Sequence, residues 1–460
     1  MNRQPTTKDL TEIFSIALVS FVGILMTTGV NVNFPMLVNY FKVPLSSVQW
    51  FSTGAMIVSA ITMICSAYAD QRFNDRTVFF VATGSLLLSL IICTFATNYW
   101  LFLFGRLLDG VSIGSCTPLM FNVIPKLVPK SKIGFYMALG ATVVATGPSL
   151  GPTYGGFINT YFNWRMIFVV VIPVILVVML IGFYAIVNHL PIHHNLSLDW
   201  KGLALITVAF SVIAIGLNSL SQASVWTWIM FIIGIIALVW FVKHGHQEKA
   251  ILHTRVFSNH RFTLAVITYF LIQLTNIGLS GLLIPNFSQV ALGVTALVSG
   301  LILLPGNIFR IISMPFGGAM LDHYGPRLPI YIGLSLMAGY FLVMTVIAKS
   351  LGPGTILFAY IVYNLGQAIC FSNVLTSGLQ TLPIKQRGDG NAIFNAVQIY
   401  GGAVGTCLLS LIISLAGTFN PAATKVHAMF IGGQWCFGVL FALVIIALIM
   451  IHASFKKAQD

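Results

Sequence analysis

Charged side chains are scarce in this sequence. Of 460 residues, 7% are charged and 57% are hydrophobic, whereas a typical soluble domain carries about 25% charged residues. So few charges cannot cover a surface that faces water, which excludes an ordinary soluble protein. Apolar runs of roughly 20 residues, the length that crosses a bilayer as a helix, recur along the chain. The sequence therefore predicts an all-α integral membrane protein.

Several chemical signatures are also missing. The six cysteines lie in apolar runs, with no CxxC spacing and no neighbouring histidines, so neither disulfides nor a metal site are expected. The sequence offers no nucleophile–base pair, and its glycine clusters lie inside apolar runs rather than after strands. We therefore expect no enzyme and no cofactor.

Apolar runs between polar punctuation predict fourteen spans. With the N-terminus inside, seventeen lysines and arginines fall in inner segments and four in outer ones, while Arg106 and Arg310 lie within spans. This positive-inside bias places both termini in the cytoplasm. The same bias explains the net charge of +13, because cations of the inner segments contact anionic lipids of the membrane. We therefore expect membrane lipid as a partner and no nucleic acid. The spans lie near 13–38, 46–68, 77–97, 100–124, 133–158, 164–187, 202–220, 225–242, 262–284, 295–318, 328–348, 353–375, 390–414 and 428–452.

Two predicted inner loops resemble each other. The loop after the second span, "SAYADQRFNDRTVFF", and the loop after the tenth, "GGAMLDHYGPRLPI", each place an acid before a turn and a base. Asn74 stands in the first loop where the second has a turn glycine, and asparagine tolerates left-handed backbone. Related halves around a central site are a recurring transporter architecture. These loops are candidates for a cytoplasmic gate, with plain solvated turns as the alternative: Asp70, Arg72, Arg76, Asp322 and Arg327.

Seven short motifs occur in a fixed order along nearly the whole chain. They are "SSVQW" (46–50), "GRLLDGVSIG" (105–114), "GPSLGPTYGG" (147–156), "NWRMIFVVVIP" (163–173), "LDWKG" (198–202), "GLILLPGNI" (300–308) and "NAVQIYGGAVG" (395–405). In this order they resemble the major facilitator superfamily (MFS), and within it the fourteen-helix drug:proton antiporter family. The chain departs from that pattern at Met26, where the family usually carries an aspartate, and at Gln398, where an arginine is common.

The resemblance implies a fold and a function. It implies two six-helix bundles, 1–190 and 246–460, with two added transmembrane helices in 191–245. The bundles would rock around a central cavity and export hydrophobic or amphiphilic drug-like small molecules in exchange for protons. We expect a monomer in the plasma membrane. The alternatives are a dedicated exporter of a metabolite, lipid or peptide-like product, and a non-transporting sensor.

Arg106 and Asp109 form the most unusual polar pair. Of ten acids, only Asp109 lies well inside a predicted span, where a charge costs at least ~2.5–3.5 kcal/mol. The two residues are three apart and share a helix face. They either pair and pin helix packing, or Asp109 exchanges a proton while Arg106 modulates its affinity. Burial favours the protonated acid and Arg106 the ionised one. The resemblance assigns the arginine of this motif to proton coupling.

The fifth span carries glycines at every fourth residue. This spacing gives the helix a face that another helix can approach closely, and its two prolines bend the helix. We predict a packing seam, to which the resemblance adds a hinge and seal that favours antiport over leak. The motif comprises Gly147, Pro148, Gly151, Pro152, Gly155 and Gly156.

Polar and aromatic side chains on otherwise apolar spans are candidates for a substrate cavity, because drug pockets are mostly apolar with a few placed polar groups. Hydrogen bonding to neighbouring helices is the alternative for each. Arg310 has no visible acid partner, and it either attracts an anionic substrate group or snorkels toward the inner surface. The other candidates are Asn31, Asn33, Trp50, Phe121, Asn122, Tyr154, Tyr269, Gln273, Asn276, Asn364, Gln367, Asn395 and Gln398.

Overall fold

The computed structural model describes residues 5–129, 133–187, 198–219, 225–247, 252–383, 386–420 and 424–456. Within these ranges every regular element is a helix, as predicted. Thirteen of the helices are long and apolar enough to cross a membrane, close to the fourteen expected. The remaining expected span, 133–158, coincides with a further 29-residue helix, α7.

The first half of the chain forms six long helices and three short ones. The short helices α2, α3 and α8 lie beside the connections between long ones. In chain order the elements are α1 (Thr7–Asn31), α2 (Phe34–Phe41), α3 (Leu45–Val48), α4 (Trp50–Arg72), α5 (Asp75–Phe95), α6 (Tyr99–Leu127), α7 (Ile133–Tyr161), α8 (Met166–Val169) and α9 (Val171–Ala185).

Two helices follow, and then a second set of six spans. The first span of this set is built from α12, a π-helical turn η4 and α13. The elements are α10 (Trp200–Ser219), α11 (Val225–His244), η3 (Thr254–Ser258), α12 (His260–Gly278), η4 (Leu279–Leu283), α13 (Ile284–Val290), α14 (Ala296–Tyr324), α15 (Arg327–Val346), η5 (Ala348–Ser350), α16 (Pro353–Gln380), α17 (Arg387–Phe419) and α18 (Lys425–Lys456).

The first span is shifted from its expected place at 13–38. It begins at Thr7 because Thr6 and Asp9 form a capping box, in which each side chain accepts a hydrogen bond from the other's backbone N–H. It ends at Asn31, since the Asn33 amide donates to the Gly29 carbonyl at 2.9 Å and Pro35 lies in the first turn of α2. Local capping therefore overrides the apolar run that continues past residue 31.

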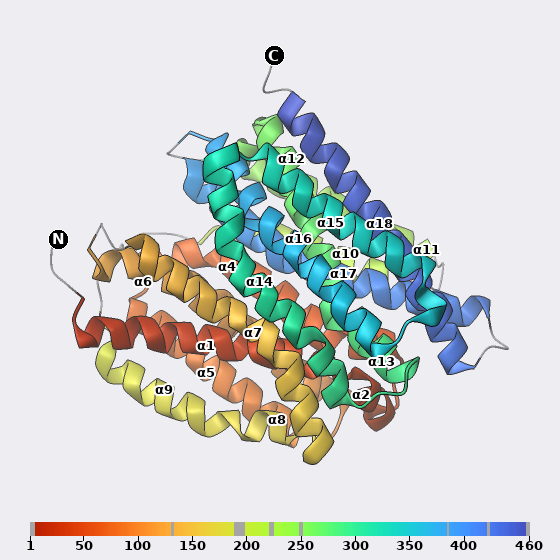
Figure 1. The fold of residues 1–460 in the computed structure, drawn as a ribbon. Coiled ribbons are helices and arrows are strands. Elements are labelled where there is room, and N and C mark those ends of the chain that lie inside the picture. Colours follow the sequence, from red (N-terminus) through yellow and green to blue (C-terminus); the bar gives the residue numbers. More distant parts are fainter. Residues whose placement is uncertain are drawn as a thin grey trace.

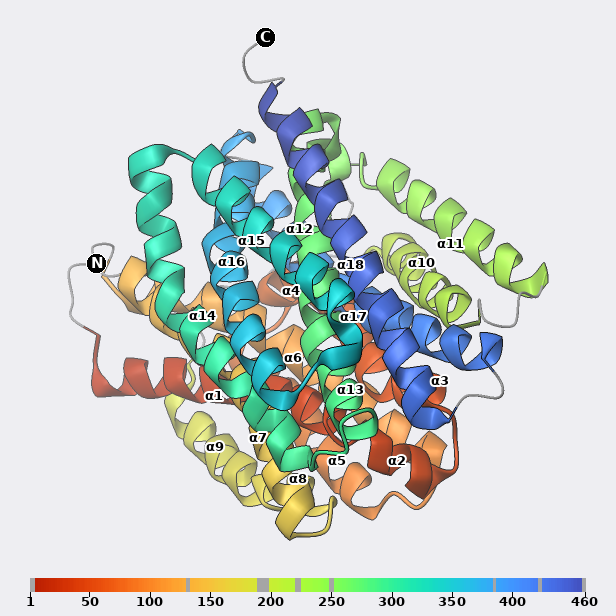
Figure 2. The ribbon, with the colours of Figure 1, turned by 45° about the vertical axis from the view of Figure 1, so that its right-hand side comes forward.

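The helices pack into two groups (Figure 1), and Figure 2 shows α10 and α11 at one side of them. In the first group α1 packs against α6, α7 and α9; in the second, α12 packs against α16, α17 and α18. Helix α10 joins the second group at Tyr400, whose ring stacks on Phe210 with centroids 3.8 Å apart. The division at residues 190 and 245 stays a prediction, and residue 190 lies outside the described ranges.

The two groups meet through α4 against α17 and α7 against α14. We call the end of the bundle that carries Thr7, Arg72 and Tyr324 the termini face, and the opposite end the far face. Figure 1 shows α2 and α13 at the far face, away from both labelled chain ends.

Hydrogen bonds join the two halves near the far face. The hydroxyls of Thr53 and Thr406 are 2.8 Å apart, and the Gln289 amide donates to the Val32 carbonyl at 2.7 Å. The Thr153 hydroxyl donates to the backbone carbonyl of residue 300 at 3.3 Å. The helical residues among these lie in the far-face part of their helices, so this end of the interface is held together.

Candidate functional site

Arg106 and Asp109 lie one turn apart on α6, facing α1 and α4. Arg106 Nη1 is 2.9 Å from Asp109 Oδ2, and Arg106 Nη2 donates to the Thr27 hydroxyl at 3.1 Å. The Thr27 hydroxyl donates to Asp109 Oδ2 at 3.0 Å, and Arg106 Nε donates to the Phe51 carbonyl at 3.2 Å. Three helices are therefore joined at one polar cluster inside the first group.

This cluster is sealed from solvent. Arg106 and Asp109 are both 0% exposed, and Met26, at the position of the family's aspartate, is equally buried. Asp109 Oδ1 has no hydrogen-bond partner among the described residues. Arg106 and Asp109 thus form the ion pair that was expected if they pin helix packing. Proton exchange by Asp109 stays a prediction. The arrangement leaves one carboxylate oxygen available for a proton.

The glycines of the fifth-span motif lie at close helix contacts. A methyl group at Gly155 would lie 2.1 Å from the Gly29 carbonyl oxygen of α1, and one at Gly156 would lie 2.4 Å from the Ala296 carbonyl oxygen of α14. Gly147 and Gly151 also face α1, and Pro148 and Pro152 lie inside the helix. Helix α7 therefore packs against its own group on one side and against the other half at Gly156.

The cavity candidates of the first half divide by their hydrogen bonds. Asn33 donates to the Gly29 carbonyl and also, at 3.3 Å, to the Gly155 carbonyl. The Tyr154 hydroxyl donates to the Ile167 carbonyl at 2.8 Å. Asn31 accepts from the Ser52 hydroxyl, and its buried amide nitrogen has no partner among the described residues. Asn31 and Asn33, whose Oδ1 is also buried without a partner among the described residues, thus have unused hydrogen-bonding capacity. Trp50, Phe121 and Asn122 are half-buried.

The candidates of the second half lie on α12, α16 and α17. Tyr269 stacks on Phe371 with ring centroids 4.6 Å apart, and its hydroxyl donates to Gln398 at 2.9 Å. The Asn364 amide donates to the Tyr360 carbonyl at 2.9 Å. These contacts place the polar groups inside the second group. Of the remaining candidates, Gln273, Asn276 and Gln367 are buried and Asn395 is half-buried.

Arg310 lies on α14 and faces α16. It is 9% exposed and interacts electrostatically with Tyr360 and Tyr363. The Tyr360 hydroxyl donates to Asn307, one turn before Arg310, at 3.2 Å. The two tyrosine rings are stacked with centroids 6.0 Å apart. A cation is thus surrounded by phenol groups rather than by an acid.

The two predicted gate loops differ in conformation. In the first, Lys126 bridges Asp70 and Asp75, at 3.2 Å from an oxygen of each. Asn74 has a φ of −66°, so the expected left-handed turn is absent there, whereas Gly325 in the second loop has a φ of 71°. The first loop continues directly from the extended cap of α4 into α5, and it needs no left-handed residue.

Two other gate residues, Arg76 and Arg327, bind within their own halves. The Arg76 guanidinium lies 4.3 Å from the Phe183 ring centroid, and Arg327 donates to the Phe455 carbonyl at 3.1 Å. Arg72 has an interaction partner, and the side chain of Asp322 lies outside the described set.

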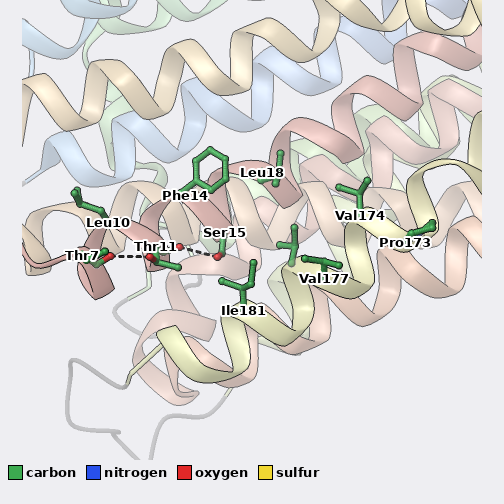
Figure 3. A pocket seen from close by; sticks show the side chains of 11 residues that line it. Thr7, Leu10, Thr11, Phe14, Ser15, Leu18, Pro173, Val174, Val177 and Ile181 are labelled. Atoms are coloured by element: carbon green, nitrogen blue, oxygen red, sulfur yellow. Dashed lines mark hydrogen bonds between the residues drawn. The ribbon is translucent and has the colours of Figure 1, made fainter.

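A hollow of a different kind lies between α1 and α9 (Figure 3). Its volume is about 610 Å³, and its lining is mostly apolar, including Phe14, Val174 and Val177. Phe14 is 60% exposed and Val177 54% exposed. Side chains of this kind face hydrocarbon in a membrane protein. The hollow contains none of the predicted site residues, so it is a surface groove rather than the candidate site.

Several residues of these clusters were not predicted. Thr27 completes the Arg106 cluster, and Lys126 bridges two acids of the first loop. Gln49 donates to Cys407 of the other half at 3.3 Å, and Glu12, expected near a helix end, is 1% exposed inside α1. Only Thr27 had a sequence signal, because it directly follows the position where the family carries an aspartate.

Known proteins resemble this chain along most of its length. The family model described as Major Facilitator Superfamily matches residues 16–205 and 201–406. The uncharacterized MFS-type transporter YhcA of Bacillus subtilis is 30% identical over 405 residues, covering 87% of this chain and 76% of the relative. Lincomycin resistance protein LmrB of the same organism is 27% identical over 459 residues, covering 97% and 95%.

Solved structures show the same fold. A bacterial homolog of the human lysosomal transporter Spinster, in an inward-facing and unoccupied conformation, matches with a TM-score of 0.71 and 12% identity, covering 98% of both chains. A D-xylose-proton symporter matches with a TM-score of 0.66 and 16% identity, covering 95% of this chain and 97% of the other. The family match, the relatives and the helical fold together lead to one conclusion: this chain is a multi-pass membrane transporter of the Major Facilitator Superfamily, with relatives that are drug-resistance proteins.

Proposed function

We propose that this transporter exports hydrophobic or amphiphilic drug-like small molecules from the cytoplasm in exchange for protons, by alternating access. Two halves, 1–190 and 246–460, move against each other, with residues 191–245 as added helices. The names of its relatives, lincomycin resistance protein and multidrug resistance protein B homolog, support the substrate class. The protein acts as a monomer in the plasma membrane, surrounded by lipid.

The buried cluster of Arg106, Asp109 and Thr27 carries the proton-coupling proposal. Asp109 Oδ1 is unpartnered while Oδ2 holds Arg106. A proton on the carboxylate removes the charge that pairs with Arg106 and weakens the link between α1 and α6. Because α1 packs on the glycine face of α7, and α7 contacts α14 of the other half, this change can reach the interface between the halves.

The direction of access follows from the proposed orientation. The seventeen lysines and arginines of the predicted inner segments support an orientation with the termini face in the cytoplasm and the joined far face outside. Substrate then enters from the cytoplasm between helices whose polar residues include Asn31, Gln273 and Asn276. The salt bridges of Lys126 with Asp70 and Asp75 hold the first gate loop in this conformation, and the halves close over the loop when they rotate.

Transport in liposomes tests the coupling. Purified protein is reconstituted with an imposed proton gradient, and export of a fluorescent amphiphile is followed with and without a protonophore. Asp109→Asn keeps the size of the side chain but cannot exchange a proton, so we expect gradient-driven export to fall to the protonophore level. Asp389→Asn is the matched control, since that acid lies in the first turn of α17.

Full gradient-driven export by Asp109→Asn would show that this carboxylate is structural. Export that is insensitive to the protonophore in the unmodified protein would exclude proton antiport altogether.

A further inference from the structure

Arg310 carries a charge in the middle of its apolar span without a counter-charge among the described residues. It is 9% exposed, and it makes no ion pair or hydrogen bond with any residue that the structure describes. It lies fourteen residues after Ala296 and eleven before Leu321, the ends of its apolar span. At 1.5 Å per residue these distances are about 21 and 16 Å. One side chain cannot snorkel that far to either membrane surface.

The acids of the second half lie far from this arginine along the chain. Between residues 252 and 460 the only acids are Asp322, Asp389 and Asp460. Asp322 follows the apolar span that carries Arg310, Asp389 lies in the first turn of α17, and Asp460 is the last residue. The one acid in mid-span, Asp109, already holds Arg106. Since an intramembrane charge is costly and marks a functional site, an outside anion is the missing partner.

The surroundings of Arg310 are suited to an amphiphile with an anionic end. Tyr360 packs against the α14 backbone, where a methyl group at residue 306 would lie 2.5 Å from its ring. Tyr363 stacks on Tyr360, and Tyr340 adds a third ring 5.2 Å from Tyr363. The hydroxyl of Tyr340 is buried without a partner among the described residues. The cation, the hydroxyl and the rings therefore lie together, with Tyr340, Tyr360 and Tyr363 at most 4% exposed in this conformation.

We propose that Arg310 binds the anionic group of the transported compound, a carboxylate or a group of similar shape, beside the buried phenols of Tyr360 and Tyr363. The planar guanidinium matches a carboxylate with two parallel hydrogen bonds. The inference deepens the proposed export function and rests on it for the identification of the bound compound as cargo. It makes anionic amphiphiles the preferred substrate class.

Binding measurements on the purified full-length protein test anion binding by Arg310 without a proton gradient. The probes are 1-pyrenebutyrate and 1-pyrenebutanol, which share ring and chain and differ in the anionic group. The unmodified protein is expected to bind the butyrate more tightly. Arg310→Gln is expected to lower its affinity for the butyrate about tenfold or more, because a charge-assisted pair is lost, and to leave the butanol affinity unchanged. Lys201→Gln, at an exposed cation of α10, is the matched control.

Each possible result decides the proposal. Equal affinity of the unmodified protein for both probes, or an equal loss for both in Arg310→Gln, would assign Arg310 a structural role. If Arg310→Gln does not fold, Arg310→Lys must keep the preference for the butyrate, because it keeps the charge. Chloride that displaces the butyrate at millimolar concentration would assign the site to an inorganic ion and overturn the substrate proposal. A preserved preference together with proton-independent transport would contradict only the coupling mechanism.

Discussion

The two buried arginines of this transporter lie in different halves and in opposite electrostatic settings. Arg106 is held by Asp109, by the Thr27 hydroxyl and by the Phe51 carbonyl. Arg310 lies beside tyrosines, with no acid partner among the described residues. The first half therefore contains its own neutralising charge, whereas the second leaves one positive charge for a ligand. On this difference rest our proposals of proton coupling in the first half and anion recognition in the second.

The scaffold around these sites is much more alike. In the first half Gly155 of α7 lies against the Gly29 carbonyl of α1; in the second, Gly405 of α17 lies against the Leu274 carbonyl of α12. A methyl group would meet these oxygens at 2.1 and 2.2 Å, respectively. Both halves thus use a glycine of one helix to approach the backbone of another closely. The two halves therefore share this mode of helix packing and differ in their buried charged residues.

The largest expected effect comes from removing each arginine in turn. Arg106→Met leaves Asp109 buried and unpaired, and we expect the free energy of unfolding to fall by ~3–5 kcal/mol. Arg310→Met makes the same chemical change without orphaning an acid, so its stability is expected to be equal or higher. Thermal unfolding of both variants in one detergent measures the difference. Similar losses in the two variants would remove the contrast between the halves.

A smaller effect is expected at the helix seam of the first half. Gly155→Ala places a methyl group against the Gly29 carbonyl, and overpacking of this kind lowers stability by about 1–3 kcal/mol. Gly84→Ala on α5 is the control, because no heavy atom lies within 4 Å of its added methyl. Thermal unfolding again reports the result. A Gly155→Ala protein as stable as the control would mean that the seam is loosely packed.

The smallest effect concerns the contact between the halves. Thr53→Val removes the hydrogen bond to Thr406, and a bond of this kind contributes about 0.6 kcal/mol within a membrane. The population with a separated far face should therefore rise about threefold. Spin labels are placed at exposed residues 77 and 388, on the termini face of each half. The distances between the labels measure the population with a separated far face. Thr62→Val is the control: the Thr62 hydroxyl donates within α4 to the Val58 carbonyl at 2.8 Å, so its removal should leave the populations unchanged.

Much of the fold could be predicted because the helices obey local rules. Apolar length alone located the spans, including the two added helices, to within a few residues. The first span was misplaced because the capping box at Thr6 and the bond from Asn33 act against the apolar run. At the candidate site, the three-residue spacing placed Arg106 beside Asp109, but Thr27 lies 79 positions from Arg106 and no helical periodicity connects them.

The sequence by itself determined that the protein lies in lipid, the approximate number and bounds of its membrane spans, and its family. It could do so because hydropathy and short motifs depend on neighbouring residues. It also showed that two arginines lie within the membrane. Only the tertiary structure decided that one of them is neutralised and the other is not. Neutralisation depends on which side chains of distant helices come within a few ångströms, and a linear pattern does not record those distances.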